Sequence, residues 1–324
     1  MKKLLALILA AAMTLSLTAC GGGGDTNAGG DDTIKIGILQ QLEHPSLDQS
    51  REGFIQALAD NGYVDGENIV IDYQNAQADQ SNLSNMADRL VSDKSDLILA
   101  IATGAAQTVA GKTSDIPVLI TAVTDPVDAG VVNSMENPGT NVSGTSDASP
   151  MKEQLELLLT LKDEVKTVGL LYTSSEDNSV LQISQAKAIL DDMKVAYVEQ
   201  TVTNSNDVQQ AVQSLVNKCD GIYIPTDNVL ASSMALVADI TWPAGIPVVT
   251  GAESMVTDGG LATLGLSYYN LGYQTGEMAV KVLEGADIST MPVETQKEYA
   301  YIVNGDAVSA MNITLPAELA QYVK

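Results

Sequence analysis

The feature that most constrains the fold of this chain is an alternation of short apolar runs with longer amphipathic stretches, which occurs twice. Short apolar runs are typical of buried strands, and helical spacing is typical of helices that cover them. The predicted strands span residues 34–39, 69–73, 97–102, 118–122, 167–172, 196–202, 221–224 and 248–250. The predicted helices span residues 47–60, 82–91, 151–161, 180–193, 208–216 and 231–240. This alternation predicts parallel sheets with right-handed crossovers.

The two halves of the pattern are similar, which predicts two similar lobes. In each half an aspartate enters an apolar strand that ends at a threonine, at 96–103 and again at 220–226. A further predicted helix at 269–283 implies that the chain crosses back to the first lobe. We expect a fold of the α/β class, with two Rossmann-like lobes of parallel sheet joined by a multi-strand hinge, a device that closes around ligands. The expected domains are residues 33–146 plus 267–290 for the N-terminal lobe and 147–266 plus 291–324 for the C-terminal lobe.

The first twenty residues predict export and anchoring. Lys2 and Lys3 precede an apolar stretch at residues 4–17 that is too short for a convincing membrane span. The sequence Leu-Thr-Ala-Cys that ends at Cys20 resembles the lipobox of bacterial lipoproteins. That resemblance implies a signal peptide at residues 1–19 and diacylation of Cys20; the alternative is an ordinary secretory signal with an accidental cysteine. Residues 20–32 are Gly-rich and predict a flexible tether.

Two fatty acid chains, palmitate among them, would anchor the chain stably by burying their methylene groups. We therefore expect the protein on the extracytoplasmic face of the cell membrane, held by its lipid alone. The formal net charge of −25 repels nucleic acid and anionic lipid headgroups, so neither is expected as a binding partner.

The chain lacks the sharp motifs of catalysis. Its single histidine, His44, makes the two-histidine HExxH motif impossible, and neither a CxxC pair nor a GxSxG elbow is present. The stretch at residues 104–113 has six residues between its glycines where a P-loop has four. We expect no enzyme, no metal and no cofactor, although a catalytic pair of carboxylates stays open. Cys219 is expected to be a small buried hydrophobe.

Polar side chains follow most of the predicted strands. In open parallel sheets, ligands bind in the crevice beyond the carboxyl ends of the strands. The candidates are Glu43, His44, Thr103, Gly104, Thr124, Asp125, Ser174, Ser175, Asn178, Ser179, Thr226, Asp227, Asn228 and Glu253. Such groups suit a small polar ligand whose hydrogen bonds must be met away from water, but the same residue types also cap helices. Asp125, Asp227 and Glu253 are candidates for a ligand ammonium, and His44 is expected either in the cleft or in solvent.

Stretches along almost all of the mature chain carry one family resemblance. They are residues 43–48, 61–64, 71–77, 97–107, 121–127, 144–147, 225–228, 253–256 and 268–276. They resemble the ABC transporter substrate-binding proteins associated with tryptophan and tyrosine uptake, the TrpX-like lipoproteins. The resemblance implies a type I periplasmic-binding fold and an amino-acid ligand, often aromatic, held between the lobes.

The resemblance also implies roles for single residues. Asp227 would pair with the α-ammonium of the ligand, and Ser174, Ser175, Asn178 and Ser179 would bind its carboxylate. The wall of the first lobe would be completed by Thr103, Thr124, Asp125, Thr145 and Ser146. One departure is Gly104, which stands where the family commonly has proline. Proline preorganises a helix start, so this part of the wall is in doubt.

The function predicted is that of a solute receptor for an ABC importer. It would act as a monomer, capture a small molecule and deliver it to permease subunits that a separate ATPase drives. Two alternatives stay open, a sensory module that presents its ligand to a membrane receptor and an exported hydrolase. Genes for a permease and an ATPase beside this one would favour transport.

Overall fold

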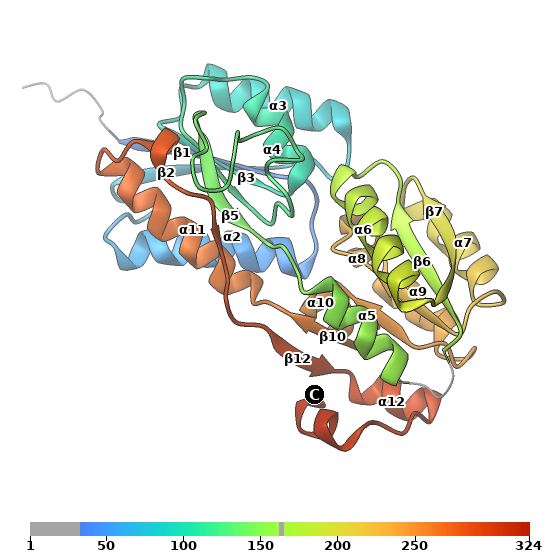
Figure 1. Cartoon of the computed structure of the whole chain (residues 1–324). Helices are drawn as coiled ribbons and strands as arrows, with labels where there is room; N and C mark the ends of the chain where they lie inside the picture. The colour runs from blue at the N-terminus through green and yellow to red at the C-terminus, as the bar shows by residue number, and fades with distance from the viewer. Residues whose placement is uncertain (1–32, 162–164) are drawn as a thin grey trace, which may run out of the picture. The chain divides into compact units, whose positions relative to one another are not determined.

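Two six-stranded sheets organise the part of the chain that the computed structural model describes, residues 33–161 and 165–324. The expected signal peptide and tether, with Cys20, lie outside the described residues. Residues 34–324 form one unit by their internal contacts. Within this unit we call the first sheet with its helices the first lobe and the second sheet with its helices the second lobe (Figure 1).

The first sheet has the order β11-β5-β4-β3-β1-β2, and all of its pairings are parallel. Its strands are β1 (Ile34–Gln40), β2 (Ile69–Asn75), β3 (Leu97–Ile101), β4 (Val118–Thr121), β5 (Val142–Ser146) and β11 (Glu294–Thr295). Its helices are α2 (Pro45–Asp60), α3 (Gln80–Ser92), α4 (Thr103–Ala110) and α11 (Tyr268–Leu283), with the short turn η2 (Ile288–Thr290). Every residue of β3 is buried, as its unbroken apolar sequence predicts.

The second sheet has the order β12-β10-β9-β8-β6-β7, and only β12 runs antiparallel to its neighbour among the described pairings. Its strands are β6 (Thr167–Thr173), β7 (Ala196–Val202), β8 (Gly221–Ile224), β9 (Val248–Thr250), β10 (Ala262–Gly265) and β12 (Ala300–Val303). Its helices are α5 (Met151–Thr160), α6 (Asp177–Met193), α7 (Val208–Leu215), α8 (Asn228–Ala231), α9 (Met234–Thr241), α10 (Glu253–Thr257) and α12 (Gly305–Met311), with η1 (Ser205–Asp207) and η3 (Ala317–Tyr322).

The chain crosses between the sheets three times. It passes from β5 to α5 through residues 147–150, from β10 to α11 through 266–267, and from β11 to β12 through 296–299 (Figure 1). This arrangement confirms the predicted class, two α/β lobes with several connections between them.

One strand lies in a different lobe from the one expected. Residues 291–324 were assigned to the C-terminal lobe, whereas Glu294 and Thr295 pair with Thr145 and Ser146 of the first sheet. The reason is that the third crossing follows β11 instead of preceding it. The other domain boundaries stay a prediction.

Helices α2 and α11 lie side by side against the first sheet (Figure 1) and approach each other through glycines. A Cβ atom added at Gly272 would lie 1.8 Å from the carbonyl oxygen of Ser50, and one at Gly53 would lie 2.0 Å from that of Tyr269. Both distances are far inside van der Waals contact, so this backbone approach requires glycine. The contact fixes the middle of α2 against α11, and α2 follows the end of β1.

Cys219 and the helix lengths complete the description of the fold. Cys219 is buried and its thiol donates to the carbonyl oxygen of Leu215 at 3.3 Å, which agrees with its expected packing role. Within residues 33–161 and 165–324, no helix has both the length and the apolar character that crossing a membrane would require.

Candidate ligand-binding cleft

Strand ends of both lobes face each other across a cleft. On the first lobe, β1 leads through His44 into α2, and His44 holds the N-cap position without a side-chain capping bond. On the second lobe, β8 leads to Asp227, whose carboxylate caps α8 by accepting the backbone N–H of Leu230. The two N-termini therefore bring His44 and Asn228 together, and His44 Nε2 lies 3.1 Å from Asn228 Oδ1.

Hydrogen bonds hold the two lobes against each other along the cleft. Besides the His44–Asn228 contact, Ser46 Oγ lies 2.6 Å from Ser254 Oγ. The Thr124 and Thr226 hydroxyl oxygens are 3.2 Å apart. Farther along, Gln107 donates to Asp177 at 3.0 Å. Each of these pairs joins one lobe to the other, so the structure represents the closed cleft.

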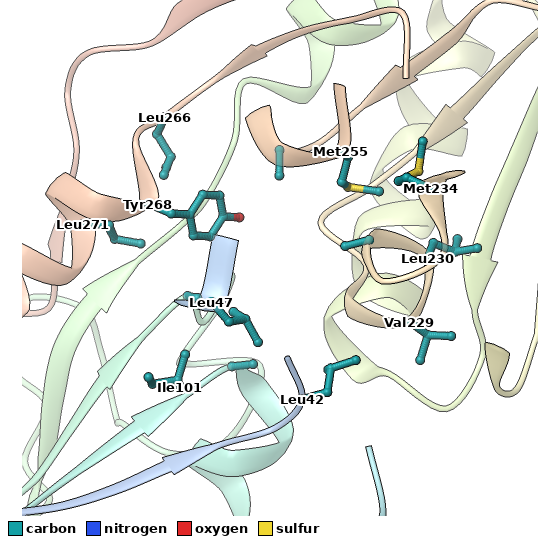
Figure 2. Close-up of a cluster of buried hydrophobic side chains, with 14 of the residues drawn as sticks. Leu42, Leu47, Ile101, Val229, Leu230, Met234, Met255, Leu266, Tyr268 and Leu271 are labelled. Atoms are coloured by element: carbon teal, nitrogen blue, oxygen red, sulfur yellow. The ribbon is translucent and has the colours of Figure 1, made fainter. Parts of the chain in front are cut away.

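An apolar cluster continues across the cleft. Figure 2 shows Leu47, Ile101 and Leu271 of the first lobe on one side of it. Leu230, Met234 and Met255 of the second lobe lie on the other side. Tyr268, the first residue of α11 after the second crossing, points its ring between them. Opening the cleft would expose these side chains to water, so apolar burial also favours the closed arrangement.

A small cavity of about 10 Å³ remains between the lobes, lined by His44, Ser46, Leu47, Asp147, Thr226, Asp227, Asn228, Ala231, Ala252, Met255 and Tyr268. Small-molecule sites commonly enclose roughly 300–1,000 Å³. This cavity is therefore too small for an amino acid as it stands, and a solute enters it only when the cleft opens.

Two buried polar atoms of this cavity have no hydrogen-bond partner among the described residues. They are Asp147 Oδ1 and His44 Nδ1. Asp147 follows β5 at the first crossing, and its other oxygen accepts the Tyr268 hydroxyl at 2.6 Å. Buried polar groups almost always find partners, so this pair of atoms marks the place where a bound molecule would complete the hydrogen bonding.

Two buried carboxylates, Asp147 and Asp227, line the small cavity, and a third, Glu176, accepts from Asn228 of its lining. Burial raises the pKa of Asp147 and of Asp227. Burial, followed by the negative charge of Asp227, raises the pKa of Glu176 to about 8, although N–H donors of Asn228 and Val229 oppose the rise. None of the three forms an ion pair within residues 33–161 and 165–324. A positively charged ligand group would stabilise the ionised form of these carboxyl groups.

The single histidine is held neutral in the closed cleft. Burial lowers the pKa of His44 from 6.5 to about 4, while its hydrogen bond to Asn228 and the charge of Asp48 act in the opposite direction. Because the charged form is penalised, His44 faces the cavity as an uncharged imidazole at neutral pH.

The pKa of His44 predicts an acid-dependent loss of stability. In the unfolded chain His44 binds a proton below about pH 6.5. In the folded protein it binds that proton only below about pH 4. The contribution of His44 to the free energy of unfolding should therefore fall by about 1.4 kcal/mol per pH unit as the pH drops from 6.5 to 4, about 3 kcal/mol in all. Urea unfolding of the wild type and of His44→Gln at pH 4 to 8 measures it. The free energy of unfolding of the wild type minus that of His44→Gln should decrease by about 3 kcal/mol as the pH falls from 6.5 to 4, and parallel curves would contradict the assignment.

A larger cavity of about 740 Å³ also lies between the lobes, and its lining residues Glu43 and Val229 are chain neighbours of His44 and Asn228 in the small cavity. Its lining includes Leu42, Gln41, Glu43, Gly104 and Gln107 of the first lobe, and Ser175, Glu176, Asp177, Asn178 and Val229 of the second. Glu176 connects the two cavities, because it lines the larger one and accepts a hydrogen bond from Asn228, which lines the small one. The larger cavity has the size of a small-molecule site.

The structure brings eight of the sequence candidates to the two cavities. His44, Thr226, Asp227 and Asn228 line the small cavity. Glu43, Gly104, Ser175 and Asn178 line the large one. The Asp227 carboxylate is already occupied, since it accepts the backbone N–H and the hydroxyl of Thr173 as well as the N–H of Leu230. The capping alternative therefore describes the role of Asp227 in this closed state.

The other candidates do not line either cavity. Thr124 bonds Thr226 across the cleft and accepts the Ser146 hydroxyl at its carbonyl oxygen, and Thr103 and Ser179 are buried. Asp125 caps a turn by accepting the N–H groups of Val127 and Asp128. The remaining three bond within the fold: Thr145 to Thr121 and Thr275, Ser174 to Val202, and Glu253 to Lys324.

The structure explains why glycine occupies position 104 in this chain. Its backbone N–H donates to Gln41 Oε1 at 2.9 Å, and Gln41 Nε2 reaches Glu176 of the second lobe at 3.5 Å. Proline has no N–H to donate. A Cβ at position 104 would also lie 2.7 Å from Gln41 Oε1. Glycine therefore preserves a hydrogen-bonded link between the lobes at the point where the sequence departs from the family pattern.

The site list drawn from the sequence lacked Asp147, Tyr268 and Glu176. Asp147 follows a strand that the apolar pattern does not reveal, and Tyr268 opens the helix after a crossing. Both lie in stretches that resemble the family, residues 144–147 and 268–276, and that resemblance could have indicated them. Among the described residues, no three His, Cys, Asp or Glu side chains are grouped in a way that would hold a metal ion.

Comparisons with known proteins agree with this geometry. The family model for ABC transporter substrate binding proteins matches residues 35–324. A tyrosine-binding protein of Clostridioides difficile is 44% identical over 332 residues, covering 100% of this chain and 96% of the relative. A solved ABC domain from Streptococcus pneumoniae in complex with L-Trp is 37% identical with a TM-score of 0.87, covering 90% of this chain and 100% of that one.

A third comparison concerns the state of the cleft. The ligand-free, open structure of a substrate-binding protein with adhesive properties from Clostridium difficile is 47% identical and covers 90% of this chain and 98% of that one, yet its TM-score is 0.69. The L-Trp complex is less identical in sequence but superimposes better. The structure described here thus has the lobe arrangement of a liganded relative, and with its fold, its cleft and its matches over the whole described length, this chain belongs to the family of ABC transporter substrate-binding proteins.

Proposed function

We propose that this protein captures an amino acid with an aromatic side chain and delivers it to the permease subunits of an ABC importer. The observation that carries the proposal is the pair of unpartnered acceptors, Asp147 Oδ1 and His44 Nδ1, in a cavity with buried carboxylates and no cation among the described residues. An α-ammonium group supplies both the positive charge and the hydrogen-bond donors that this cavity lacks.

Asp147 is the proposed ion-pair partner of the ammonium group. Its Oδ2 accepts the Tyr268 hydroxyl, and its Oδ1 has no hydrogen-bond partner among the described residues although the residue lines the cavity. The family resemblance implies this role for Asp227, whose oxygens already accept three hydrogen bonds. Asp227 contributes negative charge from the cavity wall. The candidates that line the large cavity, Asn178 and Ser175 among them, are proposed to bind the rest of the solute.

The aromatic side chain is proposed from the relatives and from the apolar surface. One relative is named for binding tyrosine, and another was solved with L-Trp. In this chain Leu42 and Val229 face the large cavity from opposite lobes and belong to the apolar cluster (Figure 2). A planar side chain buries a large apolar area between two such walls.

A thermal-shift panel tests this proposal. L-Tyrosine and L-tryptophan at 1,000 times their dissociation constant should each stabilise the protein by about 4 kcal/mol, because they bind only the folded state. 3-(4-Hydroxyphenyl)propanoate, which lacks the amino group, and a polyol of similar size serve as comparison solutes. Stabilisation by the polyol without any by the amino acids would reject the proposed ligand class.

We also propose that the mature protein is a monomer anchored through Cys20. The lipobox-like sequence supports a diacylated cysteine, and two acyl chains hold a protein on a membrane where one does not. Cys20→Ser should move the protein from the membrane fraction to the medium and abolish incorporation of labelled palmitate. Recovery of Cys20→Ser in the membrane fraction at the wild-type level would contradict the anchor. Cys219→Ser, the same change at the other cysteine, is the matched control.

A further inference from the structure

The second lobe holds His44 through a chain of two hydrogen bonds. Asn228 Oδ1 lies 3.1 Å from His44 Nε2, and Asn228 Nδ2 donates to Glu176 Oε2 at 2.9 Å. The same Glu176 oxygen accepts the backbone N–H of Asn228 at 3.0 Å. All three side chains are buried in the closed cleft. These hydrogen bonds therefore link the N-cap of α6, the first residue of α8 and the N-cap of α2.

Glu176 determines which way the Asn228 amide faces. Each oxygen of Glu176 accepts a backbone N–H, Oε2 from Asn228 and Oε1 from Val229, so both oxygens act as acceptors here. The Asn228 side-chain group that faces Oε2 is therefore a donor. The NH₂ of Asn228 therefore points to Glu176, and its oxygen points to His44. An oxygen only accepts, so His44 must carry its proton on Nε2.

A neutral imidazole with its proton on Nε2 has a lone pair on Nδ1. Nδ1 is the ring nitrogen that has no partner among the described residues, and it lies in a residue that lines the small cavity with Asp147. The burial of His44 keeps the ring uncharged, since its pKa is about 4. Both unpartnered atoms of the cavity are consequently acceptors, and both require a donor.

We propose that Asn228 is a positioning residue that, held by Glu176, fixes the tautomer of His44 so that Nδ1 accepts a hydrogen bond from the ammonium group of the bound solute. This inference rests on the proposed function. It adds that selection for an amino group depends on the second lobe, because Asn228 reaches His44 only when the cleft is closed. A solute without the amino group leaves Nδ1 and Asp147 Oδ1 buried without a donor, which is costly.

The first test compares L-tyrosine with 3-(4-hydroxyphenyl)propanoate by calorimetry. Asn228→Ala should weaken binding of L-tyrosine about tenfold or more, the loss expected for a hydrogen bond to a charged group, and should change binding of the analogue by less than about threefold. The matched control is Ser254→Ala, which removes the cross-lobe bond to Ser46 without touching His44. It should weaken both probes by the same factor. An equal effect of Asn228→Ala on both probes would show that Asn228 only supports closure.

The second test reads the tautomer directly. The chain contains one histidine, so the ¹⁵N spectrum of histidine-labelled, untagged protein reports His44 alone. With L-tyrosine bound, Nε2 should give the signal of a protonated ring nitrogen and Nδ1 that of an unprotonated one. A proton on Nδ1 in a wild-type protein that binds L-tyrosine overturns the proposed positioning role and leaves the proposed function intact. A wild-type protein that binds neither L-tyrosine nor L-tryptophan overturns the function itself.

Discussion

Replacing Asp147 with asparagine should weaken binding of L-tyrosine by at least about 30-fold. Asparagine preserves the shape and an oxygen for the Tyr268 hydroxyl, but it places an NH₂ group where Asp147 Oδ1 now faces the cavity. The ligand ammonium would then lose its ion pair and meet a donor. Removing one partner of a buried, hydrogen-bonded charge pair costs about 2–5 kcal/mol, and the lower end corresponds to the expected factor.

The same substitution should leave the unliganded protein at least as stable as the wild type. Burial raises the pKa of Asp147, which means that the empty cavity penalises its charge, and a neutral amide avoids that penalty. Calorimetry for affinity and thermal melting without ligand measure the two effects. Asp125→Asn is the matched control, because Asp125 caps a turn outside both cavities, and its affinity should stay within about twofold. A normal affinity of Asp147→Asn would remove Asp147 from the site.

The sequence predicts most of the fold because buried parallel strands have a distinctive composition. The runs Ile-Lys-Ile-Gly-Ile-Leu-Gln of β1 and Leu-Ile-Leu-Ala-Ile of β3 are nearly continuous apolar segments. Strand β5 does not have this apolar composition. Its sequence Val-Ser-Gly-Thr-Ser contains one large apolar residue, yet all five residues are buried, because the hydroxyls of Ser143 and Thr145 find partners in Met291 and in Thr121 and Thr275.

The missed strand explains why the sequence candidates do not include Asp147, the proposed partner of the ligand ammonium. Asp147 follows β5 directly, so a search that lists residues at the ends of apolar runs passes over it. Asp227 illustrates a second limit of strand-end reasoning. Its place at a strand end is right, but whether a carboxylate caps the next helix or faces a ligand depends on the position of Thr173, which lies 54 residues earlier in the chain. Strand-end residues predict where a cleft lies, whereas free acceptors follow from packing between distant segments.

Replacing Gly272 with alanine should destabilise the protein by about 3 kcal/mol, at the upper end of the cost of overpacking. The new Cβ would lie 1.8 Å from the Ser50 carbonyl oxygen, and this oxygen belongs to the backbone of α2 and cannot rotate away. Helices α2 and α11 must separate, which also loosens the close approach at Gly53. The gain in helix propensity, about 1 kcal/mol, does not offset this. The melting temperature should fall by roughly 6 °C or more.

Gly111→Ala provides the matched control, since it makes the same chemical change where the nearest atom is much farther away. Gly111 ends α4 with a φ of −72°, which any residue adopts, and its added Cβ would approach no atom closer than 3.3 Å. Its melting temperature should stay within a few degrees or rise, because alanine reduces the freedom of the unfolded chain. Because Ser50 and His44 belong to the same start of α2, Gly272→Ala should also weaken L-tyrosine binding in the fraction that folds. Equal melting temperatures for the two alanine variants would show that the helices do not require this contact.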